Sequence, residues 1–316
     1  MPNYYIRKRK IRQYFQLPSK KAYMIIFSVV IPFSGDVALL ERCVASIPDY
    51  SNIEVIVIDN NKIGISVDYF NSHKNVTILY SDSERSAGHA RNVGLRQVTG
   101  KWILFADSDD FFEPGAFDVF DSYKENDADI LFFDVTSRFS DTLMPANRNI
   151  GLSRLIKQYD PSCVFWQTKI RYEWLPPWGK MIRRSLITNN MIEFEDRVAG
   201  NDVLFSVQSG FYANKLATLP LPLYCITDRA GSLTTIRSVE YFISRFCAML
   251  NANRFLGSKN STYRLNVFIW LYVSCTYGCI YPFLFLWLVV KYRVNIFIGW
   301  NRSWKALWRR VFIKLG

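Results

Sequence analysis

Histidine is nearly absent from this sequence, and its cysteines lack the spacing of a metal site. There are two histidines, His73 and His89, and none of the six cysteines belongs to a CxxC pair. Zinc sites are usually built from closely spaced cysteine and histidine ligands, so no zinc site is expected. The cysteines also show no disulfide framework, so we expect reduced thiols in a cytoplasmic compartment.

Acidic residues are missing from both ends of the chain. The segment before Asp36 contains seven Lys or Arg and the segment after Glu240 contains eleven, with no acid in either. The net charge of +12 therefore lies at the ends, and the middle carries 21 bases against 27 acids. Because these bases are interleaved with aromatic and aliphatic residues, we expect a membrane surface, rather than nucleic acid, as the partner of both ends.

The N-terminal segment does not have the pattern of a cleavable signal. The apolar stretch at 24–31 that follows its basic run is too short, and Pro32 ends it. We expect residues 1–23 to form a basic amphipathic helix at the membrane interface, with a disordered basic arm as the alternative.

One long run near the C-terminus has no charge. Residues 266–290 exceed the ~20 residues that span a hydrocarbon core, and both flanks are basic, so no orientation is indicated. Gly278 and Pro282 interrupt the run, which permits a re-entrant hairpin or two in-plane helices as well as a span. A buried helix pair is the remaining alternative. With the basic, aromatic tail at 294–316, the region 241–316 is predicted to be helical and membrane-associated.

Short apolar strands alternate with helices in the first half of the chain. Strands are predicted at 24–32, 53–58, 76–80, 101–106 and 129–135, and helices at 36–47, 86–98 and 114–124. This alternation is typical of an α/β fold with a doubly wound, mostly parallel, Rossmann-like sheet. Residues 136–200 have little periodicity; a helix at 201–212 and an edge strand at 216–226 follow.

Two of the predicted strands end in carboxylates. Asp59 follows the second strand and Asp107 follows the fourth, and such strand ends face one crevice. Asp107 and Asp109 lie two residues apart, a pattern that suits Mg²⁺ or Mn²⁺ shared with a diphosphate; a solvated turn is the alternative. We expect Asp59 to bind a base or ribose, or to cap a helix, and Asp110 to be structural.

Two further segments can supply charge to the crevice. Arg85 and Arg91 flank the small residues 86–88 at a helix start, where an anion can bind, and His89 is expected to pack or cap. Asp202 opens a later helix. It is either a general base that deprotonates a hydroxyl or a favourable first-turn charge.

Six segments, in this order, resemble the family 2 glycosyltransferases, which have the GT-A fold and transfer sugars with inversion. They are SVVIPFSG at 28–35, EVIVIDNN at 54–61, GHARNVGL at 88–95, GKWILFADSDDFFEPGAF at 100–117, PWGKMIRRSLI at 177–187 and GNDVLFSV at 200–207. Each segment alone is weak, but the ordered set is specific.

The resemblance implies roles for the residues of the crevice. Nucleotide-sugar binding is expected of Pro32, Phe33, Asp59, Arg85, Arg91, Asp107 and Ser108. Asp107 and Asp109 would hold Mn²⁺ or Mg²⁺, and Asp202 would deprotonate the acceptor hydroxyl.

Three positions depart from the family pattern. Asp59 is followed by Asn60 and Asn61 where the family has Asp-Gly-Ser, and Ser86 stands where glycine is common. Asn201 replaces the usual Glu before Asp202, which removes one acid from the acceptor site and keeps the expected base.

The sequence thus predicts a metal-dependent, inverting glycosyltransferase. We expect it to move a sugar from a nucleotide sugar, with UDP favoured, to a lipid-linked or polysaccharide hydroxyl in bacterial capsule, O-antigen or exopolysaccharide synthesis. Residues 24–135 would bind the donor and 136–240 the acceptor, at the cytoplasmic face of the bacterial inner membrane. The alternatives are a catalytically weak membrane-bound scaffold and a nucleotidyltransferase; the latter lacks its Gly-rich basic loop here.

Overall fold

The computed structural model describes residues 24–61, 64–65, 70, 73–82, 86–229 and 238–295. The interfacial helix predicted at 1–23 therefore lies outside the described residues. So do Arg85 and almost all of the basic tail predicted at 294–316.

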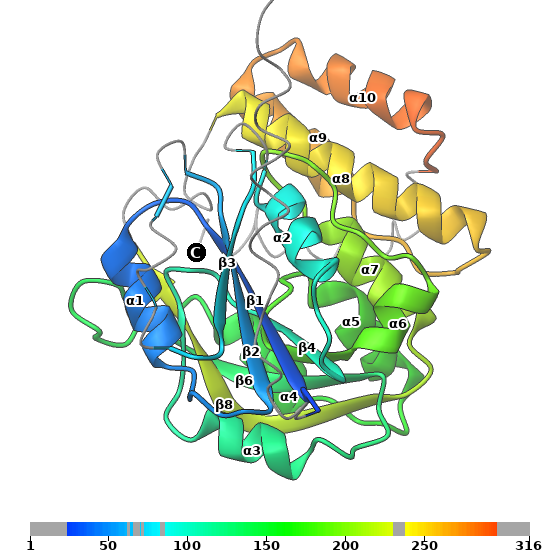
Figure 1. The fold of residues 1–316 in the computed structure, drawn as a ribbon. Coiled ribbons are helices and arrows are strands. Elements are labelled where there is room, and N and C mark those ends of the chain that lie inside the picture. The colour runs from blue at the N-terminus through cyan, green and yellow to red at the C-terminus, as the bar shows by residue number, and fades with distance from the viewer. Residues whose placement is uncertain are drawn as a thin grey trace, which may run out of the picture.

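One mixed sheet organises the described chain (Figure 1). Its strand order is β3-β2-β1-β4-β7-β6-β8-β5. The strands are β1 (Phe27–Phe33), β2 (Ile53–Asp59), β3 (Val76–Tyr80), β4 (Trp102–Phe105), β5 (Phe111–Phe112), β6 (Ile130–Phe139), β7 (Lys180–Arg183) and β8 (Leu216–Asp228). Four pairings are parallel and three are antiparallel. Strands from both predicted halves of the chain share this sheet.

The mixed character comes from the second half of the chain. Strands β1 to β4 pair only in parallel with one another, as the alternating pattern predicted. Strand β7 lies between β4 and β6 and runs antiparallel to both. Its four residues fall in the segment 136–200, where no regular element was predicted.

Helices cover the sheet and extend beyond it. They are α1 (Val37–Ala45), α2 (Ala87–Leu95), α3 (Ala116–Ser122), α4 (Ile150–Lys157), α5 (Val164–Glu173), α6 (Arg184–Asn189), α7 (Val203–Tyr212), α8 (Val239–Ser258), α9 (Phe268–Ser274) and α10 (Tyr281–Lys291). Helix α2 packs on β1 and β2, and α7 packs on α5 and α8. Helices α8, α9 and α10 form a separate layer at the top of Figure 1.

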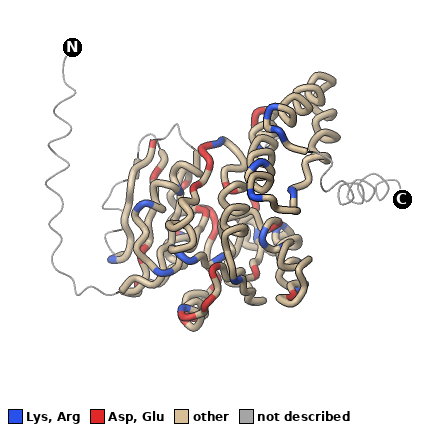
Figure 2. The backbone as a smooth tube through the Cα atoms, turned by 90° about the vertical axis from the view of Figure 1, so that its right-hand side faces the viewer, with Lys and Arg blue, Asp and Glu red and all other residues tan. Residues whose placement is uncertain are grey.

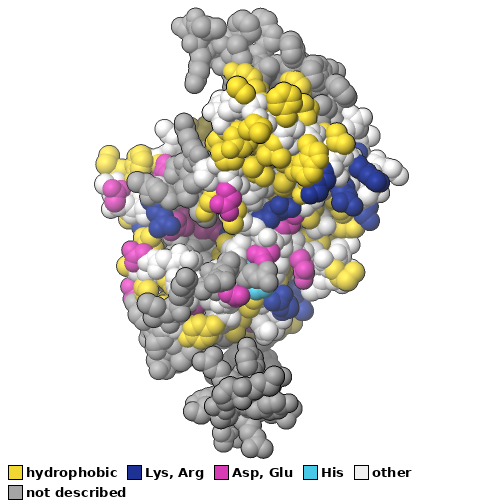
Figure 3. Space-filling model, turned by 90° about the horizontal axis from the view of Figure 1, so that it is seen from above, with side chains coloured by type: hydrophobic (Ala, Val, Ile, Leu, Met, Phe, Trp, Pro, Cys, Tyr) yellow, Lys and Arg dark blue, Asp and Glu magenta, His cyan; other side chains and the backbone are white. Residues whose placement is uncertain are grey.

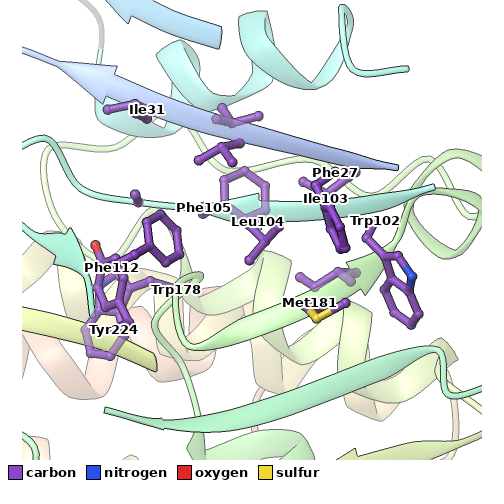
Figure 4. Close-up of a cluster of buried hydrophobic side chains, with 14 of the residues drawn as sticks. Phe27, Ile31, Trp102, Ile103, Leu104, Phe105, Phe112, Trp178, Met181 and Tyr224 are labelled. Carbon is purple, nitrogen blue, oxygen red and sulfur yellow. The ribbon is translucent and has the colours of Figure 1, made fainter. Parts of the chain in front are cut away.

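Aromatic packing fixes the position of α7 relative to β4. Phe105 at the end of β4 makes edge contacts with Phe194 and Phe205, whose rings stack on each other with centroids 3.9 Å apart. Phe105 is buried in the cluster between β1, β4 and β7 (Figure 4). Full burial of one such ring contributes about 2–3 kcal/mol. This packing brings the start of α7 next to the carboxylates that follow β4.

The uncharged run at 266–290 does not form one long helix. It is divided into α9, a 3₁₀ turn at Cys275–Tyr277 and α10. The break occurs at Gly278, whose φ of 127° lies outside helical space, and Pro282 lies in the first turn of α10. In the described part of the chain, no helix is long and apolar enough to cross a membrane.

Candidate active site

The C-terminal ends of β1, β2 and β4 lie side by side. Phe33 pairs with Asp59 across β1 and β2, and Val30 pairs with Phe105, two residues before Asp107. Because parallel strands end at the same edge of a sheet, Asp59 and Asp107 belong to one crevice.

Asp110 anchors the turn that carries Asp107 and Asp109. Its carboxylate accepts hydrogen bonds from the Thr227 N–H at 2.7 Å and from the Tyr224 hydroxyl at 2.9 Å, both on β8. The same hydroxyl accepts from the Asp107 N–H at 2.9 Å. Burial raises the pKa of Asp110 well above its usual value, and the neighbouring acids add to the effect. Asp110 thus has the structural contacts expected from the sequence.

Arg91 joins α2 to two segments of the crevice. Its Nη2 lies 2.5 Å from Asp107 Oδ1, and its Nη1 donates to Asn201 Oδ1 at 3.0 Å. The guanidinium also lies 5.4 Å from the centre of the Phe194 ring. Asn201 stands where the resemblance expects Glu, and its amide accepts the hydrogen bond without adding a negative charge. The positive charge of Arg91 is therefore shared by Asp107 and any anion that binds beside it.

Asp109 occupies the outer side of the turn. Its Oδ2 lies 3.3 Å from Arg229 Nε, and its backbone carbonyl accepts from Arg42 Nη2 at 2.6 Å and from Thr227 Oγ1 at 2.9 Å. Burial, followed by the charge of Asp107, raises the pKa of Asp109. The backbone of Asp109 is thus fixed from two sides, while its carboxylate pairs with the exposed side chain of Arg229.

The donor set of this turn fits a divalent cation shared with a ligand. Among the described residues, no three Asp, Glu, His or Cys side chains are grouped to hold a metal. Asp107 and Asp109 alone would leave most coordination positions to other oxygens. Mg²⁺ is commonly bound this way, by one or two carboxylates together with substrate phosphates and water. Burial is the main cause of the raised pKa of Asp109, and a cation here would relieve the repulsion from Asp107 that adds to it.

Asp202 lies at the N-cap of α7, and a buried lysine lies close by. Burial raises the pKa of Asp202, and the positive charge of Arg91 partly opposes that shift. Burial lowers the pKa of Lys180 to about 7, opposed by the charge of Asp202. The Lys180 Nζ donates to the Trp174 carbonyl at 2.9 Å and to Ser206 Oγ at 3.1 Å, one turn beyond Asp202. A carboxylate with a raised pKa is a stronger base, which suits the predicted role.

The loop that precedes Asp202 is held against α2. Asn92 Nδ2 donates to the Phe194 carbonyl at 2.8 Å, and its Oδ1 accepts from the Phe194 N–H at 2.8 Å. A Cβ added at Gly88 would lie 2.2 Å from the Glu195 carbonyl and 2.8 Å from Asn201 Cβ. Helix α2 and this loop therefore approach each other at a distance that only glycine allows.

Gly88→Ala should displace the loop and with it the Arg91–Asn201 contact. We expect the free energy of unfolding to fall by about 1–3 kcal/mol, measured by urea denaturation, together with a loss of donor turnover. Gly151→Ala on α4 is the matched control, because nothing lies within 4 Å of its added Cβ. In that helix, Ala should leave stability unchanged or raise it slightly. Equal stability of the two variants would contradict the close approach.

Three of the residues predicted to hold the nucleotide, Pro32, Phe33 and Asp59, are buried at the ends of β1 and β2. Asp59 Oδ1 accepts from the N–H and the side-chain amide of Asn61, both at 2.9 Å, and Oδ2 accepts from the Ile65 N–H. A nucleobase that hydrogen-bonds to Asp59 must therefore share the carboxylate with these donors or replace them. Ser108 is half-buried on the Asp107 turn.

Several residues around the site were not singled out from the sequence. They are Arg42, Asn92, Lys180, Tyr224 and Arg229. Asn92 lies inside the segment GHARNVGL, but its hydrogen bonds to Phe194 were not predicted. A cavity of about 660 Å³ also adjoins Arg229, lined by Asp36, Leu39, Phe139, Ser140, Asp141 and Asp228.

Comparison with solved structures gives the fold. The crystal structure of Staphylococcus aureus TarS 1–349 in complex with UDP-GlcNAc superposes with a TM-score of 0.60 and 21% identity over 72% of this chain and 66% of that one. The mannosyltransferase PcManGT from Pyrobaculum calidifontis, in complex with GDP-Man and Mn²⁺, gives 0.52 and 14% identity over 90% and 87%. The expected GT-A fold is thereby confirmed.

Sequence relatives give the family. TarS of Staphylococcus aureus, a poly(ribitol-phosphate) beta-N-acetylglucosaminyltransferase, is 25% identical over 71% of this chain, and the glycosyltransferase GlyA of Streptococcus pneumoniae is 25% identical over 70%. The matches span 38% of TarS and 33% of GlyA, so the chain covers little more than a third of these relatives. The model named Glycosyl transferase family 2 matches residues 28–193, more than half of the chain. The chain therefore belongs to glycosyl transferase family 2, as its motifs indicated.

Proposed function

We propose that this protein is an inverting, metal-dependent glycosyltransferase that moves a sugar from a nucleotide sugar, with UDP favoured, to an acceptor hydroxyl. The observation that carries the proposal is the Arg91–Asp107 pair next to Asp109, with Asp202 on the adjoining loop. Related structures support a nucleotide-sugar donor, because TarS has been solved with UDP-GlcNAc and with UDP. The Mn²⁺ in the PcManGT complex supports a divalent metal.

The proposed chemistry is a single displacement at the anomeric carbon. Asp202 accepts the proton of the acceptor hydroxyl, whose oxygen forms the new bond to the anomeric carbon from the side opposite the diphosphate. The bond from that carbon to the diphosphate oxygen breaks, and the nucleoside diphosphate leaves with the bonding electrons. Arg91 stabilises the charge that develops on the leaving group. A bound Mn²⁺ or Mg²⁺, held by Asp107 and Asp109, would supply further neutralisation.

The acceptor is proposed to be a lipid-linked or polysaccharide hydroxyl in bacterial cell-surface polysaccharide synthesis. The polymer-modifying relatives support this class, among them TarS and a poly(ribitol-phosphate) beta-glucosyltransferase of Bacillus spizizenii that is 25% identical over 67% of this chain. We place the enzyme at the cytoplasmic face of the bacterial inner membrane. Capsule, O-antigen and exopolysaccharide synthesis all remain within this proposal.

Product analysis of the purified protein tests the proposed function. The protein is incubated with UDP-, GDP- and dTDP-sugars in the presence of Mn²⁺, and the released phosphates are identified. We expect the nucleoside diphosphate of one donor to appear, by transfer or slow hydrolysis. Release of pyrophosphate would instead indicate a nucleotidyltransferase. Absence of both turnover and nucleotide binding would indicate a scaffold.

A further inference from the structure

Helix α10 is apolar on the face that meets solvent as well as on the face that packs. Its inner side chains, Phe285, Leu288 and Val289, are buried against α8. On the outer face, Ile280 and Phe283 are each 71% exposed, Trp287 is 55% exposed and Val290 is 74% exposed. Soluble helices normally place polar residues on that side.

The exposed residues form one continuous stripe. The spacing of Ile280, Phe283, Trp287 and Val290 places them along one side of a helix. Tyr272, at the end of α9, is also half-exposed. Hydrophobic side chains gather on this part of the surface, with basic side chains beside them (Figure 3). We call the outward face of α9 and α10, defined by Tyr272, Ile280, Phe283, Trp287 and Val290, the apolar face.

The charge around the apolar face indicates which kind of partner it binds. Lys291 lies over the Trp287 ring at 4.9 Å and Arg293 follows it, both exposed at the end of α10. From Tyr241 to the C-terminus the chain has eleven bases and no acid, and the bases of α8 to α10 are marked in Figure 2. A second copy would bring like charges together, whereas a bilayer with anionic headgroups offers both apolar depth and opposite charge.

The helix beneath the apolar face also holds the loop that leads to Asp202. On α8, Ser244 Oγ donates to the Ala199 carbonyl at 2.9 Å, and Asn251 Nδ2 donates to Glu195 Oε1 at 2.6 Å. A Cβ at Gly200 would lie 3.1 Å from that of Ala248. Helix α8 therefore packs against α10, which carries the apolar face, and also contacts the loop that leads to Asp202.

We propose that the apolar face docks in the plane of an anionic phospholipid bilayer and sets the Asp202 side of the crevice beside that bilayer. The docking stands on the exposed residues and their charge alone. The further consequence, that the acceptor hydroxyl belongs to a lipid-linked glycan, rests on the proposed function.

Co-sedimentation with vesicles tests the docking. The full chain is mixed with phosphatidylglycerol vesicles and, separately, with phosphatidylcholine vesicles. We expect binding to the anionic vesicles that weakens in high salt. The double variant F283S/W287S should bind at least about tenfold more weakly, because two large side chains no longer enter the bilayer. The charge variant K291E/R293E should lose preference for the anionic lipid.

The matched control removes an exposed apolar pair elsewhere. Val164 and Phe165 on α5 are 76% and 55% exposed, and V164S/F165S should bind vesicles like the wild type. Thermal unfolding of each variant checks that it is folded. Wild-type protein that stays in the supernatant, or F283S/W287S that binds as tightly as the control, would overturn the docking. So would a wild-type dimer that F283S/W287S converts to a monomer, since a second copy would then be the partner.

A separate arm distinguishes failure of the docking from failure of the proposed function. If the wild-type protein binds vesicles but no nucleotide sugar, the proposed docking surface is supported and the proposed lipid-linked acceptor is contradicted. If nucleotide sugars are turned over, a lipid-linked acceptor in the vesicles should be glycosylated faster than the same glycan released into solution. Equal rates on the two acceptors would overturn the orientation of the crevice.

Discussion

Asp202→Asn is expected to lower the kcat of sugar transfer by about 10²–10⁴-fold, the usual contribution of a general base. Asparagine keeps the size of the side chain but cannot accept the proton of the acceptor hydroxyl. UDP affinity should change little, because Arg91, Asp107 and Asp109 are untouched. The measurement is steady-state transfer with a saturating donor, with UDP titration of the same protein.

The stability of this variant separates a catalytic loss from a folding loss. Burial raises the pKa of Asp202, so the protonated form favours the folded state. Its contribution to stability is present at low pH and is lost as the pH rises through the raised pKa. Asn carries no charge to bury, so the free energy of unfolding at neutral pH should stay the same or rise.

The pH profile gives an independent readout of Asp202. In the wild type, kcat should fall on the acidic side at a pH above the usual range of an aspartate, and Asp202→Asn should lose that limb. Asp118→Asn, an exposed acid in the first turn of α3, is the control and should behave like the wild type. A kcat within a few-fold of the wild type would remove Asp202 from the mechanism.

Asp109→Ala is expected to have the second large effect, a loss of metal-dependent turnover by at least about 10²-fold. The turn itself should persist, because Arg42 and Thr227 contact the backbone carbonyl of Asp109 and not its side chain. The nucleoside diphosphate released in the presence of Mn²⁺ is measured for Asp109→Ala and for Asp118→Ala as the control. Thermal unfolding should give similar midpoints for both.

Protonation competes with the metal at the same carboxylate. Because burial and Asp107 raise the pKa of Asp109, Mn²⁺-dependent turnover in the wild type should weaken as the pH is lowered through that raised value. If Asp109→Ala turns over the donor at the wild-type rate, Asp109 is not the ligand of a catalytic metal.

Local pattern was enough to predict most of the strands within residues 24–135. Apolar runs of strand length that end in Asp59 and Asp107 matched β2 and β4, and parallel pairing placed both acids at one edge. Asp110, which was expected to be structural, accepts hydrogen bonds from β8. For Asp59 and Asp107 the signal was a hydrophobic strand that stops at a charged residue.

The remaining features depend on contacts between distant segments. Strand β7 is four residues long and inserts between β4 and β6, so its place is set by pairing rather than by periodicity. Arg91 reaches Asn201 across 110 residues of sequence. Single-sequence patterns carry no information about such pairs. The break at Gly278 was visible in the sequence, but the choice among a span, a hairpin and two short helices depended on packing against α8.

The most direct test of the account is a calorimetric titration of UDP into the wild-type protein with and without Mn²⁺. If Asp107 and Asp109 hold a cation that bridges to a diphosphate, UDP should bind in the presence of Mn²⁺, and its affinity should fall by at least about tenfold when the metal is omitted. UDP binding of equal strength in both conditions would contradict the metal bridge. No binding of UDP, GDP or dTDP in either condition would contradict the proposed donor site itself.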